Sequence, residues 1–129
     1  MSELEQFLAL PDVSDIEETI YINERLGSFV VKPMTSAQFD EYSKRCRGKV
    51  NKKGVDFDGG KFNLLIVAGQ TIKPDFNNAE LLKKAGCATA AELIEKKLLA
   101  GEIALVSEKI SAISGFNTDI NESIQEAKN

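Results

Sequence analysis

The chain has 129 residues, of which 43% are hydrophobic and 28% are charged, and this composition is ordinary for one globular domain with a single modest core. Its 20 acidic and 16 basic residues give a net charge of −4 at pH 7, which argues against a general nucleic-acid or membrane-surface binder because such partners attract clustered cations. The chain starts with acidic residues and contains no apolar run of about 18 residues, so we expect neither a signal peptide nor a membrane span.

Groups suited to catalysis or metal binding are scarce in this sequence. Histidine is absent, which removes the commonest general base, metal ligand and pH switch. The two cysteines, Cys46 and Cys87, are too few for a disulfide framework or a four-ligand zinc site, and we expect reduced thiols in a cytoplasmic protein. We therefore predict that the protein is not an enzyme and has no catalytic residues, no cofactor and no metal site.

The N-terminal part of the chain predicts a short helix followed by a β-hairpin. Ser2 is a good N-cap for a helix that ends before Pro11. Residues 15–22 carry isoleucines on alternate positions and predict a strand, and residues 28–32 predict a second strand that Pro33 ends. Because an isolated hairpin is only marginally stable in water, we expect its apolar side to rest on helices.

The next part of the chain predicts two helices separated by a loop. Thr35 with Gln38 three residues later is a capping-box pattern, and it opens a helix that runs to about Cys46. Glycine, lysine, asparagine and aspartate dominate residues 47–60, so we expect a mobile or functional loop there. Helical spacing resumes near Lys61, where a mostly apolar and central helix is expected.

Two further capping patterns follow in the C-terminal half. Asn77 or Asn78 is placed to cap a short helix that ends at Gly86, where glycine suits a left-handed C-terminal position. Thr89 with Glu92 is a second capping-box pattern and opens another helix.

The last helices complete the predicted fold. We expect Gly101 to interrupt the helix that begins after residue 89, and a final helix to span residues 103–113 and end near Gly115. The predicted fold is a mainly helical α+β domain at residues 1–116, with an N-terminal β-hairpin packed on a bundle of about four or five helices. Residues 117–129 are mostly polar and are predicted to form a flexible C-terminal tail.

A basic run without an intervening acid occupies residues 44–53. Its cations are Lys44, Arg45, Arg47, Lys49, Lys52 and Lys53. The simplest interpretation is a solvated helix end and loop, since cations in a last turn complement the helix dipole. Contact with an acidic protein or with nucleic acid stays open as an alternative, although no aromatic residue is interleaved to stack on bases. This alternative describes a small cytoplasmic interaction or regulatory module that uses the basic loop 44–53.

Several short motifs, each weak by itself, follow one another in a fixed order over most of residues 1–116. They are FVVKPMT at 29–35, NLLI at 63–66, TIKPDF at 71–76, AEL at 79–81, AELI at 91–94 and LLAGE at 98–102. This ordered set resembles the XkdN-like tail assembly chaperones of long-tailed phages and defective prophages of Gram-positive bacteria.

The resemblance implies a chaperone that coats the phage tape-measure protein in the host cytoplasm before the tail tube assembles, and that is absent from the mature virion. The implied partners are the tape-measure protein, the tail tube protein and, through weak self-association, other copies of the chain. A membrane or nucleic-acid partner and a cofactor are not implied.

We place the expected partner-binding surface in two segments, one near residues 98–103 and one from residue 116 onward. Its residues are Leu98, Leu99, Gly101, Glu102, Ile103, Phe116, Ile120 and Ile124. Their spacing leaves open whether the leucines and isoleucines face the core or a partner.

Overall fold

The computed structural model describes residues 2–116, apart from the side chain of Asn51, and the predicted tail at 117–129 lies outside this range. The helices of the described part are α1 (Glu3–Leu8), α2 (Ser36–Cys46), α3 (Gly59–Gln70), α4 (Ala79–Ala85), α5 (Ala90–Lys97) and α6 (Ala100–Ile113). The strands are β1 (Glu18–Asn23), β2 (Gly27–Val31), β3 (Arg47–Asn51), β4 (Gly54–Phe57) and β5 (Thr71–Lys73), and a short 3₁₀ turn spans Val13–Asp15. The predicted mainly helical α+β class is confirmed.

The main sheet has the order β1-β2-β5 and is antiparallel throughout. The predicted N-terminal hairpin is confirmed, with Glu18 opposite Val31 and Tyr21 opposite Ser28. Sequence analysis missed β5, which has only three residues and pairs with β2 from about forty residues away in the chain. No local sequence pattern predicts this pairing, because it depends on how the helices between the two strands pack.

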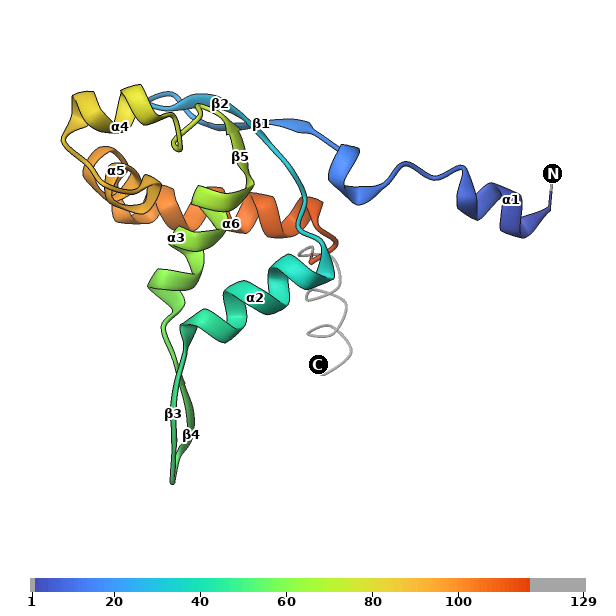
Figure 1. The fold of residues 1–129 in the computed structure, drawn as a ribbon, viewed down its shortest axis with the longest axis horizontal. Helices are drawn as coiled ribbons and strands as arrows, with labels where there is room; N and C mark the ends of the chain where they lie inside the picture. Colours follow the sequence, from blue (N-terminus) through green and yellow to red (C-terminus); the bar gives the residue numbers. More distant parts are fainter. Residues whose placement is uncertain (1, 117–129) are drawn as a thin grey trace, which may run out of the picture.

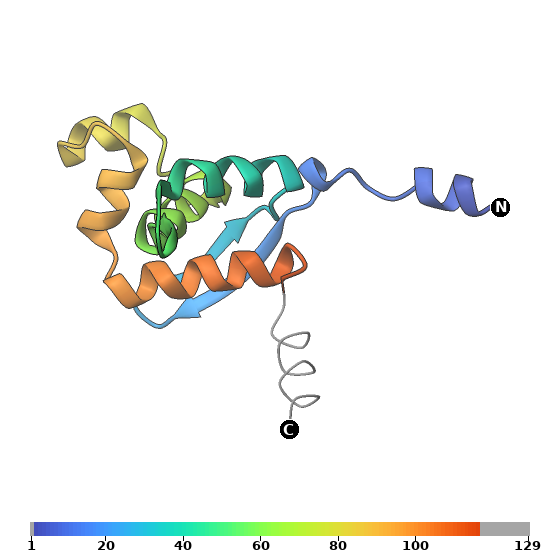
Figure 2. The ribbon, with the colours of Figure 1, turned by 90° about the horizontal axis from the view of Figure 1, so that it is seen from below.

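Helix α3 is the centre of the body, as expected, and contacts α2, α5 and α6 (Figure 2). Its Ile66 and Val67 are fully buried and belong to the same core cluster as Ile94 of α5 and Ile110 of α6. The sheet contributes Val31 to this cluster. The hairpin therefore rests on the helices, as its apolar side requires.

A polar network joins α2 to α3 and to the end of β2. The buried Gln70 amide accepts a hydrogen bond from the Tyr42 hydroxyl at 2.8 Å and donates to the carbonyls of Lys32 and Pro33 at 3.1 Å each. A Cβ at Gly69 would overlap the Tyr42 hydroxyl, so glycine permits the close approach of the two helices. This network fixes α2 against the body.

The predicted loop at 47–60 is wrong, because the chain forms a second hairpin there (β3–β4) before α3 begins. Val50 lies opposite Val55, and the turn closes at Gly54 with φ of 117°. Asp58 then caps α3 by accepting the Lys61 N–H at 3.0 Å. The basic loop 44–53 is thus divided among the last turn of α2, β3 and a tight turn.

The predicted helix break at Gly101 is also misplaced. The chain leaves the helical conformation at Leu98 and Leu99, whose φ and ψ angles are extended. Gly101 lies within the first turn of α6. The physical reason is the Glu102 carboxylate, which accepts the N–H of Leu99 at 2.8 Å and so starts a new helix at this point.

The first helix extends away from the body on an extended segment (Figures 1 and 2). Ser2 caps it as predicted, and none of its residues is buried. The five helices that pack into the body are α2 to α6, which agrees with the predicted four or five. Among the described residues, no helix has the length and apolarity needed to cross a membrane.

Candidate functional site

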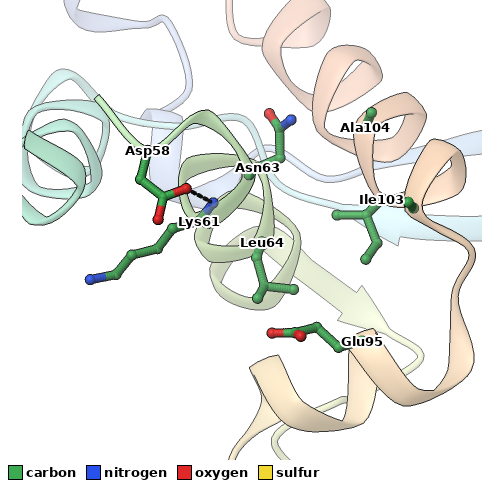
Figure 3. Close-up of a pocket in the computed structure, with 9 residues that line it drawn as sticks. Asp58, Lys61, Asn63, Leu64, Glu95, Ile103 and Ala104 are labelled. Atoms are coloured by element: carbon green, nitrogen blue, oxygen red, sulfur yellow. Dashed lines mark hydrogen bonds between the residues drawn. The ribbon is translucent and has the colours of Figure 1, made fainter. Parts of the chain in front are cut away.

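A groove of about 480 Å³ lies between the start of α3 and the first turns of α6 (Figure 3). Leu64 of α3 and Ile103 of α6 are on its two walls, and Glu95 of α5 lies at one end (Figure 3). The residues that line it are Asp58, Gly60, Lys61, Asn63, Leu64, Glu95, Ala100, Ile103 and Ala104. Small and aliphatic side chains form much of the lining, and charged groups stand at its edge.

The α3 wall of the groove is fixed by local capping. The Asp58 carboxylate holds the first turn of α3, and the Lys61 ammonium donates to the Arg45 carbonyl at 3.2 Å at the end of α2. The Ser107 hydroxyl of α6 donates to the Asn63 side-chain oxygen at 2.8 Å and ties the two walls together. The width of the groove is therefore set by rigid helices.

The α6 wall is fixed by a buried carboxylate, Glu102, which is only 6% exposed. It accepts hydrogen bonds from the Asn23 amide at 2.9 Å and from the Arg25 Nε at 3.0 Å, and it forms an ion pair with the Arg25 guanidinium. The guanidinium also donates to the Lys97 carbonyl at 2.9 Å. Glu102 and Arg25 together join the start of α6, the end of α5 and the turn after β1; we call these contacts the Glu102 anchor.

The Glu102 anchor also changes the acidity of its carboxyl group. Hydrogen bonds from Arg25, together with those from Leu99 and Asn23, lower the pKa of Glu102 from 4.5 to about 2, although burial acts in the opposite direction. The carboxylate therefore stays ionised across the neutral and mildly acidic range. The sequence offered no local indication of this pairing, because Arg25 and Glu102 are 77 residues apart.

The structure separates the predicted contact residues of the first segment into two groups. Leu98 is 8% exposed in the core, and Glu102 is engaged in its anchor. Leu99 is 63% exposed, Gly101 is exposed, and Ile103 is half-buried and lines the groove. Leu99, Gly101 and Ile103 are therefore the members of this segment that a partner can reach.

The second predicted segment begins at Phe116, which is half-exposed, while Ile120 and Ile124 lie outside the described residues. Phe116 is the first of four phenylalanines in contact, which we call the phenylalanine row: Phe116, Phe39, Phe62 and Phe57. The ring centroids of Phe116 and Phe39 are 4.7 Å apart. Sequence analysis missed this row, because its members come from α2, α3, β4 and the segment after α6.

Groups suited to metal binding or to nucleophilic catalysis are few in the described part of the chain. Among residues 2–116, no group of three or more acidic or cysteine side chains is arranged to hold a metal ion. Cys46, the last residue of α2, is buried, and burial raises the pKa of its thiol, which makes it a poor nucleophile at neutral pH. A groove with aliphatic walls and a charged edge suits an apolar side chain presented by a partner helix.

A family model and a curated relative identify one family, and a solved structure shares the fold. The family model described as phage XkdN-like tail assembly chaperone protein matches residues 4–128. The chain is 33% identical over 106 residues to the phage-like element PBSX protein XkdN of Bacillus subtilis (strain 168), which covers 78% of this chain and 72% of that protein. A crystal structure of the protein yqbn shares the fold with a TM-score of 0.66 at 23% identity, over 90% of this chain and 98% of the other.

Proposed function

Because this chain belongs to the phage XkdN-like tail assembly chaperone family, we propose that it binds the phage tape-measure protein in the host cytoplasm and is released before the virion matures. Its task is to keep apolar helices of that long protein from aggregating until tail tube subunits enclose them. In this proposal the chain acts by binding alone, without a cofactor.

The observation that carries the proposal is the groove between α3 and α6. Its aliphatic walls match the apolar side chains that an exposed tape-measure helix presents. We place Ile103 inside the contact, with Leu99 beside it at the start of α6. Leu98 and Glu102 support this surface from within and do not touch the partner.

A second contact segment in the proposal begins at Phe116 and includes Ile120 and Ile124. Phe116 supports this assignment because a large aromatic ring stays half-exposed beside a small cavity of about 180 Å³. Two weak contacts on one long partner raise the overall affinity without making either one irreversible. Such binding suits a chaperone that must later be shed.

Co-expression with the tape-measure protein tests the proposal. We expect the chain to co-purify with the tape-measure protein and to raise its soluble fraction. Ala104→Trp fills the groove from an exposed position and should reduce retention about tenfold, the cost typical of one lost anchor contact. The control Ala88→Trp adds the same side chain at an exposed position outside the groove and should have no effect. If the wild-type chain neither co-purifies nor raises solubility, the proposal fails.

Salt dependence separates this proposal from the alternative of a regulatory module that uses the basic segment 44–53. Binding that depends on buried apolar surface should weaken little between about 0.1 and 1 M NaCl, because salt screens only the interactions between charges. A steep loss of binding over the same range would favour the cations of the basic segment as the contact.

A further inference from the structure

The groove between α3 and α6 includes one acidic side chain that comes from a third helix. Glu95 lies on α5, is exposed, and reaches toward Leu64 at one end of the groove (Figure 3). Among the described residues, no hydrogen bond or ion pair engages its carboxylate. A carboxylate beside an apolar surface loses part of its hydration when a partner covers that surface, so the partner has to supply a compensating group.

The other two charged residues of the lining are already engaged within the chain. The Asp58 carboxylate caps α3 by accepting the Lys61 N–H, and the Lys61 ammonium donates to the Arg45 carbonyl. The lining therefore has two acids and one base, and the base is directed to the end of α2. The charge that a partner meets in the groove is negative.

The walls beside this carboxylate leave room for a helix. Gly60, Ala100 and Ala104 have little or no side chain, and Ala100, Ile103 and Ala104 follow the three- and four-residue spacing of one helix face. The volume of about 480 Å³ lies within the range of about 300–1,000 Å³ that ligand sites occupy, so it holds more than one side chain. A partner helix can approach α6 closely and place an aliphatic side chain between Leu64 and Ile103.

The terminal segments of this chain do not match the negative charge of the groove. Residues 2–18 contain six acidic residues and no lysine or arginine, and residues 117–129 contain three acidic residues and one lysine. Either segment would add negative charge to the groove. Charge complementarity therefore points to a separate protein as the occupant.

We propose that Glu95 selects partner helices in which a lysine or arginine lies three or four residues from the apolar side chain that fills the groove. Residues at this spacing share one side of a helix, so the apolar side chain can enter between Leu64 and Ile103 while the cation reaches the Glu95 carboxylate. This selection rests on the proposed function, and it adds the sequence pattern that the tape-measure protein carries where the chain binds. Apolar contact supplies the affinity, and the ion pair sets the register of the partner helix.

Retention of the co-expressed tape-measure protein tests the role of Glu95. At about 0.1 M NaCl, Glu95→Gln should lower retention about threefold and Glu95→Lys about tenfold, because the second change places two cations side by side. The matched control Glu108→Lys makes the same change at an exposed position of α6 outside the groove and should bind like wild type. All three variants should match wild type in urea unfolding, because both positions are exposed.

Salt separates an ion pair from a structural effect of the substitution. In about 1 M NaCl the Debye length falls to about 3 Å, so the difference between Glu95→Gln and wild type should disappear while binding through apolar surface persists. A difference of the same size at low and high salt would show that Glu95 does not act through its charge, and would overturn the proposal.

A charge exchange identifies the cation of the partner. Hydrogen exchange of the tape-measure protein locates the segment that wild type protects and Ala104→Trp does not, and this segment should contain the apolar residue and the cation at the stated spacing. Replacing that lysine or arginine with glutamate should weaken binding to wild type about tenfold, and Glu95→Lys should recover it.

Retention by Glu95→Lys equal to that of wild type overturns the selection by Glu95 and leaves the proposed function standing. The same holds for a protected segment without a cation at the stated spacing, or for equal losses in Glu95→Lys and Glu108→Lys. If Glu95→Lys changes the sedimentation of the chain alone, a second copy occupies the groove and the selection is again overturned. Failure of the wild-type chain to co-purify is a different result, which rejects the proposed function and the selection with it.

Discussion

The α5–α6 junction and the β3–β4 hairpin are both short connections that mix apolar and polar residues, yet they relate to the body in opposite ways. At the junction, the Glu102 anchor holds the backbone to the turn after β1, and Leu98 is buried beside it. On the hairpin, Val50 and Val55 remain exposed. The two regions have similarly apolar residues, but only the junction is held to the body by a long-range polar contact. Apolar side chains there enter the core, and those of the hairpin do not.

The largest effect should come from truncating the buried leucine of the junction. Leu98→Ala removes a side chain that is almost fully buried, and we expect a loss of about 2–4 kcal/mol in the free energy of unfolding. Leu99→Ala is the matched control in the next position and should change stability by less than about 0.5 kcal/mol. Urea unfolding measures both. Equal losses in the two variants would contradict the assigned boundary between core and surface.

A smaller loss should follow from breaking the Glu102 anchor. Glu102→Gln removes the ion pair but keeps the shape of the side chain, and the half-exposed Arg25 can turn to water. Because folding lowers the pKa of Glu102 from 4.5 to about 2, its contribution is complete above about pH 5 and is lost as the pH falls toward 2.

Urea unfolding at several pH values measures this contribution. Wild type should be more stable than Glu102→Gln at pH 7, and the difference should shrink between about pH 5 and pH 3. A difference that stays constant or grows as the pH falls would show that Glu102 is not held ionised in the folded protein.

The sequence predicts the local features of the fold but not its long-range contacts. The caps at Ser2, Thr35 and Thr89 were predicted correctly, and the cap of α4 is Asn78, one of the two candidates. Each cap depends on residues within a few positions along the chain. The bond between Arg25 and Glu102 was not, because it joins positions that only the folded chain brings together.

The candidate site was predicted less completely than the fold. The spacing of residues 98–103 indicated apolar packing but not which members faced outward, because Leu98 and Glu102 are buried only by elements distant in the sequence. The groove could not be predicted from that segment alone, since four of its nine lining residues belong to α3. The hairpin was missed because glycine and lysine have low strand propensity and only their pairing reveals it.

A modest loss is expected from the network that fixes α2. Tyr42→Phe leaves the buried Gln70 oxygen without its hydroxyl donor and should cost about 1–2 kcal/mol. Tyr21→Phe is the control, because Tyr21 is exposed on β1 and should tolerate the change. Urea unfolding again provides the comparison. Equal stability of Tyr42→Phe and wild type would show that the network does not hold α2 in place.

The smallest effect on stability is predicted for the hairpin. Val50→Thr keeps a β-branched side chain at an exposed strand position and should change the free energy of unfolding by less than about 0.5 kcal/mol. Urea unfolding measures this change. A loss above about 2 kcal/mol would mean that Val50 belongs to the core.

The most direct test of the central claim is hydrogen exchange of the chain with and without the tape-measure protein. The account predicts slower exchange of the backbone amides around Leu64 and Ile103 in the complex, because a partner helix covers the groove between them. Unchanged exchange in the groove, with slower exchange confined to β3 and β4, would contradict it and would place the partner on the basic hairpin.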